Sequence, residues 1–178
     1  MSSQTSLTTA GMTAAEVVAA NEELDRLLLE ELGRADLARP PRDDGEWVAV
    51  EVAAHLAEFP HFFAGEIERW RSHPGSTVGR THDDEGRLAA VAAAWSADPS
   101  RIRSRVSEAL SVLAAALGQL SDSDIAAATR NVKYGEEPLS AFLDRYVIGH
   151  KAGHLEQLRA LAAERDPRKE PVSDDDER

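Results

Sequence analysis

The chain has 178 residues, of which 42% are hydrophobic and 29% are charged, and it carries a formal net charge of -12. This length and composition favour one domain with a real core and exclude wholesale disorder, and the negative charge argues against a nucleic-acid partner. The chain contains no cysteine, which excludes disulfides, protein thiolate catalysis and zinc-thiolate sites and leaves His, Asp and Glu as candidate metal ligands.

The two ends of the chain differ in composition from its middle. Residues 1–12 are small and polar, without the basic start and apolar stretch of an export signal, and residues 166–178 combine prolines with a run of charges. We predict a flexible N-terminus over 1–12, one folded domain over 13–165 and a disordered acidic tail over 166–178. Because no apolar run of about 18 residues occurs, we expect a cytoplasmic protein with no membrane partner.

The first two predicted helices follow from capping and periodicity. Thr13 and Glu16 form a capping-box pattern, and apolar residues then recur at helical spacing, which predicts a helix over 14–33. After a proline-rich connection, a second apolar stripe predicts a helix over 48–71, kinked before Pro60. The stripe consists of Val48, Val52, Leu56, Phe59, Phe63, Ile67 and Trp70.

The middle of the chain predicts a loop and two further helices. Residues 72–84 contain two glycines and a proline and predict a loop. A shorter alanine-rich helix follows and ends near Ala97. Pro99 suits the first turn of a helix, and apolar residues at steps of three and four then predict a helix over 100–120.

The last helix completes the expected fold. Residues 125–137 form a looser segment, and after Pro138 apolar positions at helical spacing predict a helix that runs to about Glu164. Four long helices with little strand signal predict an all-α, up-and-down four-helix bundle with a short extra helix. We expect neighbouring helices to pack roughly antiparallel.

Three of the six histidines form the main chemical signal. His150 and His154, in the segment HKAGH, are four residues apart, so on a helix their side chains project from one face about 5–6 Å apart. They interrupt the apolar stripe of the last helix, and His55 lies likewise between Val52 and Phe59 on the apolar face of the second. Three imidazoles aimed at one interior predict a divalent metal site with an open position for water or substrate. The alternative, a hydrogen-bonded core histidine, is the commoner state for His55 taken alone.

Several neighbouring residues qualify this prediction. Lys151 stands where the zinc-protease motif requires glutamate, which disfavours peptide hydrolysis by that mechanism. Glu58 is the candidate catalytic residue, as proton acceptor, outer carboxylate or fourth ligand; a solvated glutamate is the alternative. Tyr146, one turn before His150, is a candidate wall of the binding pocket for substrate or cosubstrate. We assign no metal role to the other histidines, His61, His73 and His82.

Two glycines flank the histidine pair within the predicted last helix. Gly149 and Gly153 are four residues apart, and a glycine inside a helix costs about 0.5–1 kcal/mol relative to alanine. They indicate either a close approach of another segment, or space at the site, or ordinary tolerated packing.

The two histidine segments resemble those of the DinB-like superfamily. The resemblance rests on a tryptophan leading into VAAHLAEF and on VIGHKAGHLEQL about ninety residues later, and it covers residues 13–163. It implies a four-helix bundle in which His55, His150 and His154 hold zinc, nickel or a similar ion, and it implies frequent homodimers. Some relatives, of the mycothiol-dependent maleylpyruvate isomerase type or bacillithiol transferases, use the metal to activate a low-molecular-weight thiol.

We therefore expect a divalent-metal-dependent enzyme that transfers a low-molecular-weight thiol, such as mycothiol, to a small electrophile. Because the chain ends soon after the last predicted helix, we do not expect isomerase activity itself. Two alternatives stay open: a non-catalytic bundle that sequesters a small molecule, and a metal-dependent protective hydrolase. In all three cases the partner is a small molecule.

Overall fold

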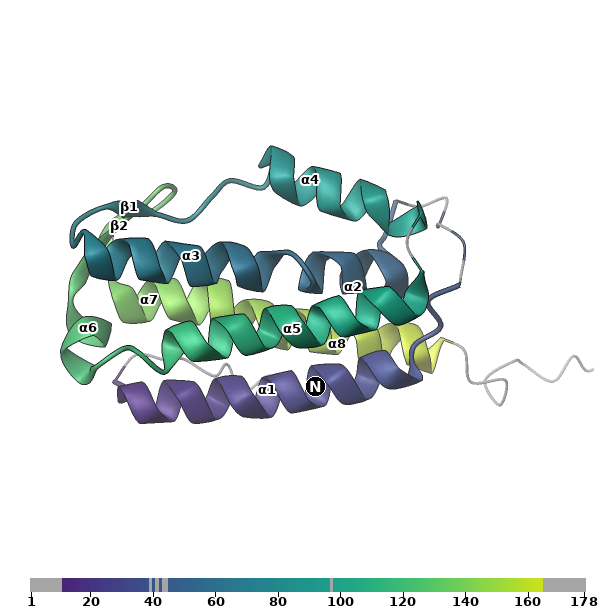
Figure 1. Cartoon of the computed structure of the whole chain (residues 1–178), viewed down its shortest axis with the longest axis horizontal. Coiled ribbons are helices and arrows are strands. Elements are labelled where there is room, and N and C mark those ends of the chain that lie inside the picture. The colour runs from purple at the N-terminus through teal and green to yellow at the C-terminus, as the bar shows by residue number, and fades with distance from the viewer. Residues whose placement is uncertain (1–10, 39, 41, 43–44, 97, 165–178) are drawn as a thin grey trace, which may run out of the picture.

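Four helical columns form the body of this computed structural model, which describes residues 11–38, 40, 42, 45–96 and 98–164 (Figure 1). This arrangement confirms the predicted all-α four-helix bundle with a short extra helix. The tail and N-terminal predictions for residues 1–10 and 165–178 lie outside the described residues. In chain order the columns are α1 (Ala14–Arg34); α2 (Ala49–Leu56) with α3 (Phe59–Ser72); α5 (Pro99–Leu117); and α7 (Leu139–Leu143) with the π-helical turn η2 (Asp144–Ile148) and α8 (Gly149–Ala163).

The first column begins where the capping pattern predicts. The Thr13 backbone N–H donates to the Glu16 carboxylate at 2.8 Å, and the Glu16 N–H donates to the Thr13 hydroxyl at 3.2 Å. Together these bonds satisfy two backbone donors that the first turn of a helix leaves without partners. The sequence therefore specifies the start of α1, and the helix ends one residue beyond the predicted boundary.

The second column is broken at the position where we predict a kink. α2 ends at Leu56 and α3 starts at Phe59, with Pro60 in its first turn. A proline at the start of a helix loses no hydrogen bond, whereas inside a helix it removes one and clashes with the preceding turn. The break therefore lies directly after His55, which occupies the last turn of α2.

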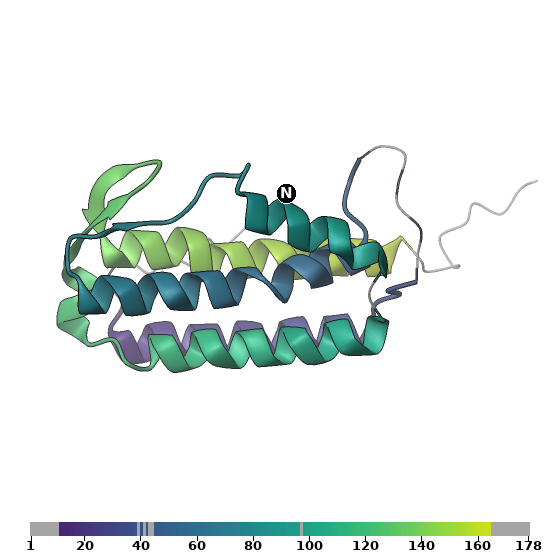
Figure 2. The same ribbon diagram turned by 45° about the horizontal axis from the view of Figure 1, so that its top comes forward.

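The directions of the four columns do not simply alternate. After α3, a long connection containing β1 (Thr77–Val78), α4 (Glu85–Ala92) and the 3-10 helix η1 (Ala93–Ser96) leads back along the bundle, so α5 starts at the same end as α2 (Figures 1 and 2). α5 is consequently parallel to α3 and antiparallel to α1. The expected antiparallel packing thus holds for α1 with α5 and not for α3 with α5, because apolar spacing carries no information on direction.

The described residues also contain a small sheet that the sequence analysis did not anticipate. A short helix, α6 (Asp122–Ala126), precedes β2 (Ala128–Asn131) and β3 (Gly135–Pro138). β2 pairs with β3 in antiparallel fashion and with β1 in parallel fashion, in the order β1-β2-β3. The predicted looser segment is therefore a hairpin whose strands are too short to show a period of two. Gly135, at a φ of 75°, allows the tight turn.

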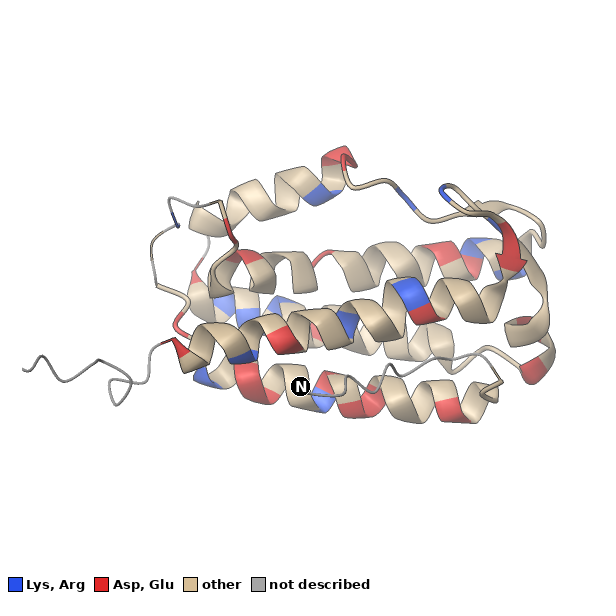
Figure 3. Ribbon diagram, turned by 180° about the vertical axis from the view of Figure 1, so that it is seen from behind, with Lys and Arg blue, Asp and Glu red and all other residues tan. Residues whose placement is uncertain are grey.

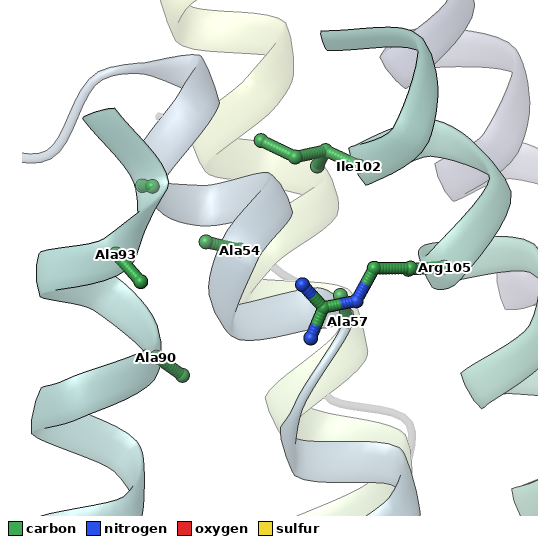
Figure 4. A pocket seen from close by; sticks show the side chains of 7 residues that line it. Ala54, Ala57, Ala90, Ala93, Ile102 and Arg105 are labelled. Atoms are coloured by element: carbon green, nitrogen blue, oxygen red, sulfur yellow. The ribbon is translucent and has the colours of Figure 1, made fainter. Parts of the chain in front are cut away.

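The α4 helix packs on the bundle mainly through alanines. None of the α4 residues is fully buried, and a small pocket of about 50 Å³ separates the helix from α2 and α5 (Figure 4). Arg105 reaches from α5 toward this gap (Figure 4). With so little apolar area against the core, α4 is the least firmly anchored of the helices along the columns. Ala97, near which we predict the end of the alanine-rich helix, lies outside the described residues.

The core lies between the columns and takes up the predicted apolar stripes. The spacing that predicts the helices also identifies the buried side chains. Five residues of the predicted apolar stripes have no exposed surface: Leu28, Val52, Phe59, Leu113 and Leu143. Within the described ranges, each helix is too short or too polar to traverse a lipid bilayer.

Candidate metal centre

The three candidate ligands come together between the second and fourth columns. His55 belongs to the last turn of α2, and His150 and His154 belong to the first turns of α8. The Nε2 atoms of His55 and His150 are 2.9 Å apart, and those of His154 and His150 are 3.1 Å apart. Ring nitrogens from all three residues lie within 4.8 Å of one another. Residues almost one hundred positions apart in the chain thus share one point inside the bundle.

The spacing of these nitrogens suits a single divalent ion. Two imidazole nitrogens at about 2.0–2.1 Å from one ion, with an angle between a right angle and the tetrahedral angle, are about 2.9–3.4 Å apart. The two Nε2 contacts of 2.9 and 3.1 Å fall in that range. A neutral His150 has one N–H and can donate through Nε2 to only one neighbour, whereas a cation satisfies all three nitrogens at once. The donor set is the kind that zinc, nickel and similar ions accept.

The environment keeps the three rings neutral, which is the state that binds a metal. Burial, followed by the charge of the neighbouring imidazoles, lowers the pKa of His55 to about 2 and that of His150 to about 3. Burial is also the main reason that the pKa of His154 is lowered. The lowered pKa values thus disfavour the imidazolium form, and each neutral ring can offer one nitrogen lone pair to a metal.

A local irregularity in the fourth column sets the start of α8. The Gly149 N–H bonds to the carbonyl of Asp144, five residues earlier, and so closes the π-helical turn η2. A Cβ at position 149 would lie 2.8 Å from that carbonyl oxygen, whereas a Cβ at Gly153 would meet nothing within 4 Å. The close contact of Gly149 is therefore with the preceding turn of its own column and not with another segment, which differs from the close approach that we expected. One extra residue in a turn rotates the following helix by about 100°, and the rotated residues begin with His150.

Glu58 lies beside His55 but is bound to another residue. Its two carboxylate oxygens accept from the guanidinium of Arg80 at 2.5 and 2.6 Å. Glu58 Oε2 is 3.7 Å from His55 Nδ1, too far for a hydrogen bond, and Nδ1 is buried without a partner among the described residues. The Glu58 carboxylate is thus partly buried and ion-paired with Arg80. Arg80, on the predicted loop, was missed because its role depends on the folded path of that loop.

Aromatic and amide groups hold the rings in place. His154 Nδ1 is 3.1 Å from the Gln157 side-chain oxygen, and donation from Nδ1 leaves the lone pair of Nε2 free for a metal. Trp47 stacks on His154 with an interplanar angle of 6°, and Phe59 lies 4.7 Å from the centre of the His150 ring. Packing and hydrogen bonding together orient the cluster before any ion binds.

A cavity of about 260 Å³ opens onto the cluster. Its wall includes His55 and His150, and Tyr146 lies in the same wall, where we predict a pocket residue. Phe63 packs against Tyr146 with ring centres 5.3 Å apart and forms an apolar part of that wall. The exposed His61 and His73 are not in the cluster; His82 lines the cavity without joining the three nitrogens. The cavity provides the open access to the centre that three protein ligands would leave.

Lys151 points from α8 toward α1 and has a structural role that the motif does not reveal. Its side chain is 0% exposed, and the ammonium donates to the Asn21 side-chain oxygen at 2.6 Å and to the carboxylate of Asp25. These bonds link α8 to α1 next to the histidine pair in the chain. The sequence signal that we missed is the polar pair Asn21 and Asp25, four residues apart, on the inner side of the first helix.

Comparisons with known proteins agree with the fold. A family model of the DinB superfamily matches residues 15–158, and a search of curated proteins gives no match. YfiT from Bacillus subtilis, described as a probable metal-dependent hydrolase with an unusual four-helix bundle topology, superposes with a TM-score of 0.67 at 19% identity over 92% of this chain and 93% of YfiT. The mycothiol-dependent maleylpyruvate isomerase superposes with a TM-score of 0.60 at 17% identity over 82% of this chain and 62% of the isomerase. At such identities the structural likeness shows the fold alone.

Proposed function

Because this chain belongs to the DinB superfamily, we propose that it is a divalent-metal-dependent enzyme that transfers a low-molecular-weight thiol to a small electrophile. The observation that carries the proposal is the convergence of the Nε2 atoms of His55, His150 and His154 beside a cavity that His55 and His150 line. A site of this kind binds a small molecule next to its metal, rather than serving as a closed structural clamp.

The three histidines would hold zinc or nickel through their Nε2 atoms. When bound, such an ion supplies positive charge that lowers the pKa of a nearby thiol, so that a thiolate nucleophile exists near neutral pH. The chain has no cysteine, so the thiol has to come from a cosubstrate such as mycothiol. The isomerase with the same fold, whose name states dependence on mycothiol, supports this cosubstrate.

The other residues at the site have supporting roles in this proposal. A carboxylate with two short bonds to an arginine is a weak base, so the contacts of Glu58 favour the outer-carboxylate role over that of proton acceptor. As His55 Nδ1 is 3.7 Å away, a small movement lets Glu58 accept its proton and fix the ring. Tyr146 would form the side of the cavity against which the substrate packs.

The test combines metal content with thiol conjugation. Metal-loaded protein is assayed with mycothiol, bacillithiol and glutathione against a panel of electrophiles, and His154→Ala is compared with His61→Ala, an exposed histidine outside the cluster. We expect His154→Ala to lose both metal and turnover and His61→Ala to keep both. Equal activity in His154→Ala would remove the proposal. Tight binding of a compound without turnover, unaffected by a chelator, would identify a sequestering bundle instead.

A hydrolase is the second candidate, and one comparison favours it. This chain matches 93% of the length of YfiT, described as a probable metal-dependent hydrolase, but only 62% of the length of the isomerase. The hydrolase candidate requires that the same metal centre cleave amide or ester substrates in the absence of any thiol. The test is a panel of amide and ester substrates without added thiol. Release of product by the unmodified chain, and loss of this activity in His154→Ala, would identify a hydrolase.

Assembly and location belong to the same proposal. The superfamily resemblance implies a homodimer, which sedimentation velocity of the full-length chain would detect as a species of twice the 19.3 kDa mass. A thiol-transfer reaction also fits a cytoplasmic location, because low-molecular-weight thiols stay reduced there.

A further inference from the structure

The wall of the cavity at the histidine cluster carries an excess of positive charge. Of the residues that line it within the described part of the chain, four are Lys or Arg and none is Asp or Glu, although the chain as a whole has a net charge of -12. These cations come from separate segments on one side of the bundle, and the segment before α4 and the strand hairpin both carry Lys or Arg there (Figure 3). The four residues are Arg80, Arg87, Lys133 and Arg145.

Two of these four cations already have carboxylate partners. Arg80 binds both oxygens of Glu58 and also donates to Asp84 at 3.0 Å. Arg145 binds both oxygens of Glu137 at 2.9 to 3.0 Å. An ion pair of this kind cancels most of the charge that a ligand would experience.

The other two cations have no such partner among the described residues. Arg87 donates to the backbone carbonyl of His82 at 2.8 Å and lies over the ring of Trp47 at 5.1 Å, and no carboxylate forms an ion pair with it or with Lys133. The charge of Lys133 contributes slightly to lowering the pKa of Asp83, but the two side chains form no ion pair. Arg87 and Lys133 therefore present charge that the protein itself does not neutralise.

Arg87 shares the cavity wall with two of the candidate metal ligands, His55 and His150. Three neutral imidazoles add no negative charge to offset a divalent ion, so the loaded centre and Arg87 both attract an anion to the cavity. The aromatic rings of Phe63 and Tyr146 in the same wall provide an apolar surface for the remainder of such a molecule.

We propose that the cavity selects a small organic carboxylate as the electrophilic substrate, with its carboxylate toward Arg87 and Lys133 and its apolar part against Phe63 and Tyr146. This inference names the substrate class of the proposed thiol transfer and rests on that function. Arg87 has the planar, two-pronged donor geometry that matches a carboxylate, and Lys133 adds a point charge. A cavity of about 260 Å³ limits the substrate to a small molecule.

The experiment compares two probes of nearly the same shape, cinnamate and the neutral cinnamamide, by calorimetric titration of the metal-loaded full-length chain. We expect cinnamate to bind about tenfold or more tightly, since one charge-assisted contact contributes on that order. Arg87→Gln with Lys133→Gln should abolish the difference, whereas Arg101→Gln, an exposed cation on α5 away from the cavity, should preserve it. Equal affinity for the two probes, or no binding of either, would overturn the inference.

Two further variants separate this inference from the proposed function and from a folding defect. Lys133 is exposed, so Lys133→Gln alone should fold normally and lower the selectivity, and Arg87→Lys should retain much of it. Selectivity that survives the double glutamine variant and disappears with the metal in His154→Ala would assign anion binding to the ion and contradict the role of the two side chains. Failure of the proposed function is read from turnover with thiol and from metal content, which neither probe titration measures.

Discussion

At the scale of single residues, the candidate centre depends on buried polar groups that are nearly, but not completely, satisfied. His55 is only 2% exposed and its Nδ1 lacks a hydrogen-bond partner among the described residues, while the Glu58 carboxylate lies 3.7 Å away. A buried polar atom without a partner is rare and costly in native proteins. An ion bound to Nε2 of His55 would make its Nδ1–H a stronger hydrogen-bond donor. The Glu58 carboxylate could then move closer and accept this hydrogen bond.

A charge-neutral substitution at Glu58 tests that relation. Glu58→Gln removes the negative charge facing His55 Nδ1 and breaks the ion pair with Arg80, so we expect the affinity for zinc to fall about 10- to 100-fold. Competition with a chromophoric chelator measures the affinity. Glu68→Gln, an exposed glutamate on α3, the helix that follows Glu58, serves as the matched control and should bind as the unmodified chain does. Unchanged zinc affinity in Glu58→Gln would show that the Glu58 carboxylate does not strengthen metal binding by His55.

A second residue-scale prediction concerns the buried ammonium of Lys151. Lys151→Met leaves the carboxylate of Asp25 and the amide of Asn21 without their partner in a site that is 0% exposed at the lysine. We expect the free energy of unfolding in urea to decrease by about 3–5 kcal/mol. Adding Asp25→Asn should recover part of the loss, because it removes the unpaired charge. A loss below about 1 kcal/mol in Lys151→Met would mean that water or another group compensates the carboxylate.

At the scale of elements, two breaks in helical regularity position the three histidines. The second column is interrupted directly after His55, and the fourth column contains a π-helical turn directly before His150. Irregular turns of this kind occur often at functional sites. Each break changes the rotation or direction of a helix next to a ligand, so the convergence of the nitrogens depends on the breaks as well as on the ligands.

The paired glycines of the fourth column allow a controlled test of this dependence. Gly149→Ala places a Cβ 2.8 Å from the Asp144 carbonyl oxygen, so the π-helical turn has to shift and His150 with it. We expect a loss of about 1–3 kcal/mol in the free energy of unfolding and weaker metal binding. Gly153→Ala, with open space around its Cβ, should instead gain up to about 0.5–1 kcal/mol from helix propensity. Equal effects of the two substitutions would argue against a positioning role for η2.

At the scale of the whole molecule, the centre connects columns that are distant in sequence. His55 lies on α2, and the other two ligands lie on α8, so an ion bound to all three would link the second and fourth columns. The cationic wall of the cavity adds segments from the long connection and from the hairpin. In the proposed function, the bundle holds the metal ligands, and the connections around it supply the contacts that discriminate among substrates.

Removal of the ion should therefore affect the stability of the complete domain. A ligand that binds only the folded state adds about 2.7 kcal/mol at one hundred times its Kd, so we expect a chelator to lower the Tm of zinc-loaded protein by several degrees. His55→Ala protein, which lacks one ligand, should melt at the same temperature with and without chelator. A chelator-independent Tm in the unmodified chain would indicate that no ion connects the columns.

Some features of the whole molecule can be predicted from the sequence, and others cannot. The columns, the capped start of α1 and the break near Pro60 follow from local spacing and helix chemistry, which act within a few residues. Helix direction, the pairing of β1 with β2 and the contact of Arg80 with Glu58 depend on the path of the long connection, which local patterns do not encode. The histidines could be identified because His150 and His154 interrupt an apolar stripe. Arg87 and Lys133 stand out only once the cavity is formed.

The most direct test of the central claim is the metal content of full-length protein purified without an affinity tag. We predict close to one zinc or nickel ion per chain after loading and dialysis, and a loss of most of it in each of His55→Ala, His150→Ala and His154→Ala. Protein that retains no divalent ion after loading, or single variants that bind as much as the unmodified chain, would contradict the account.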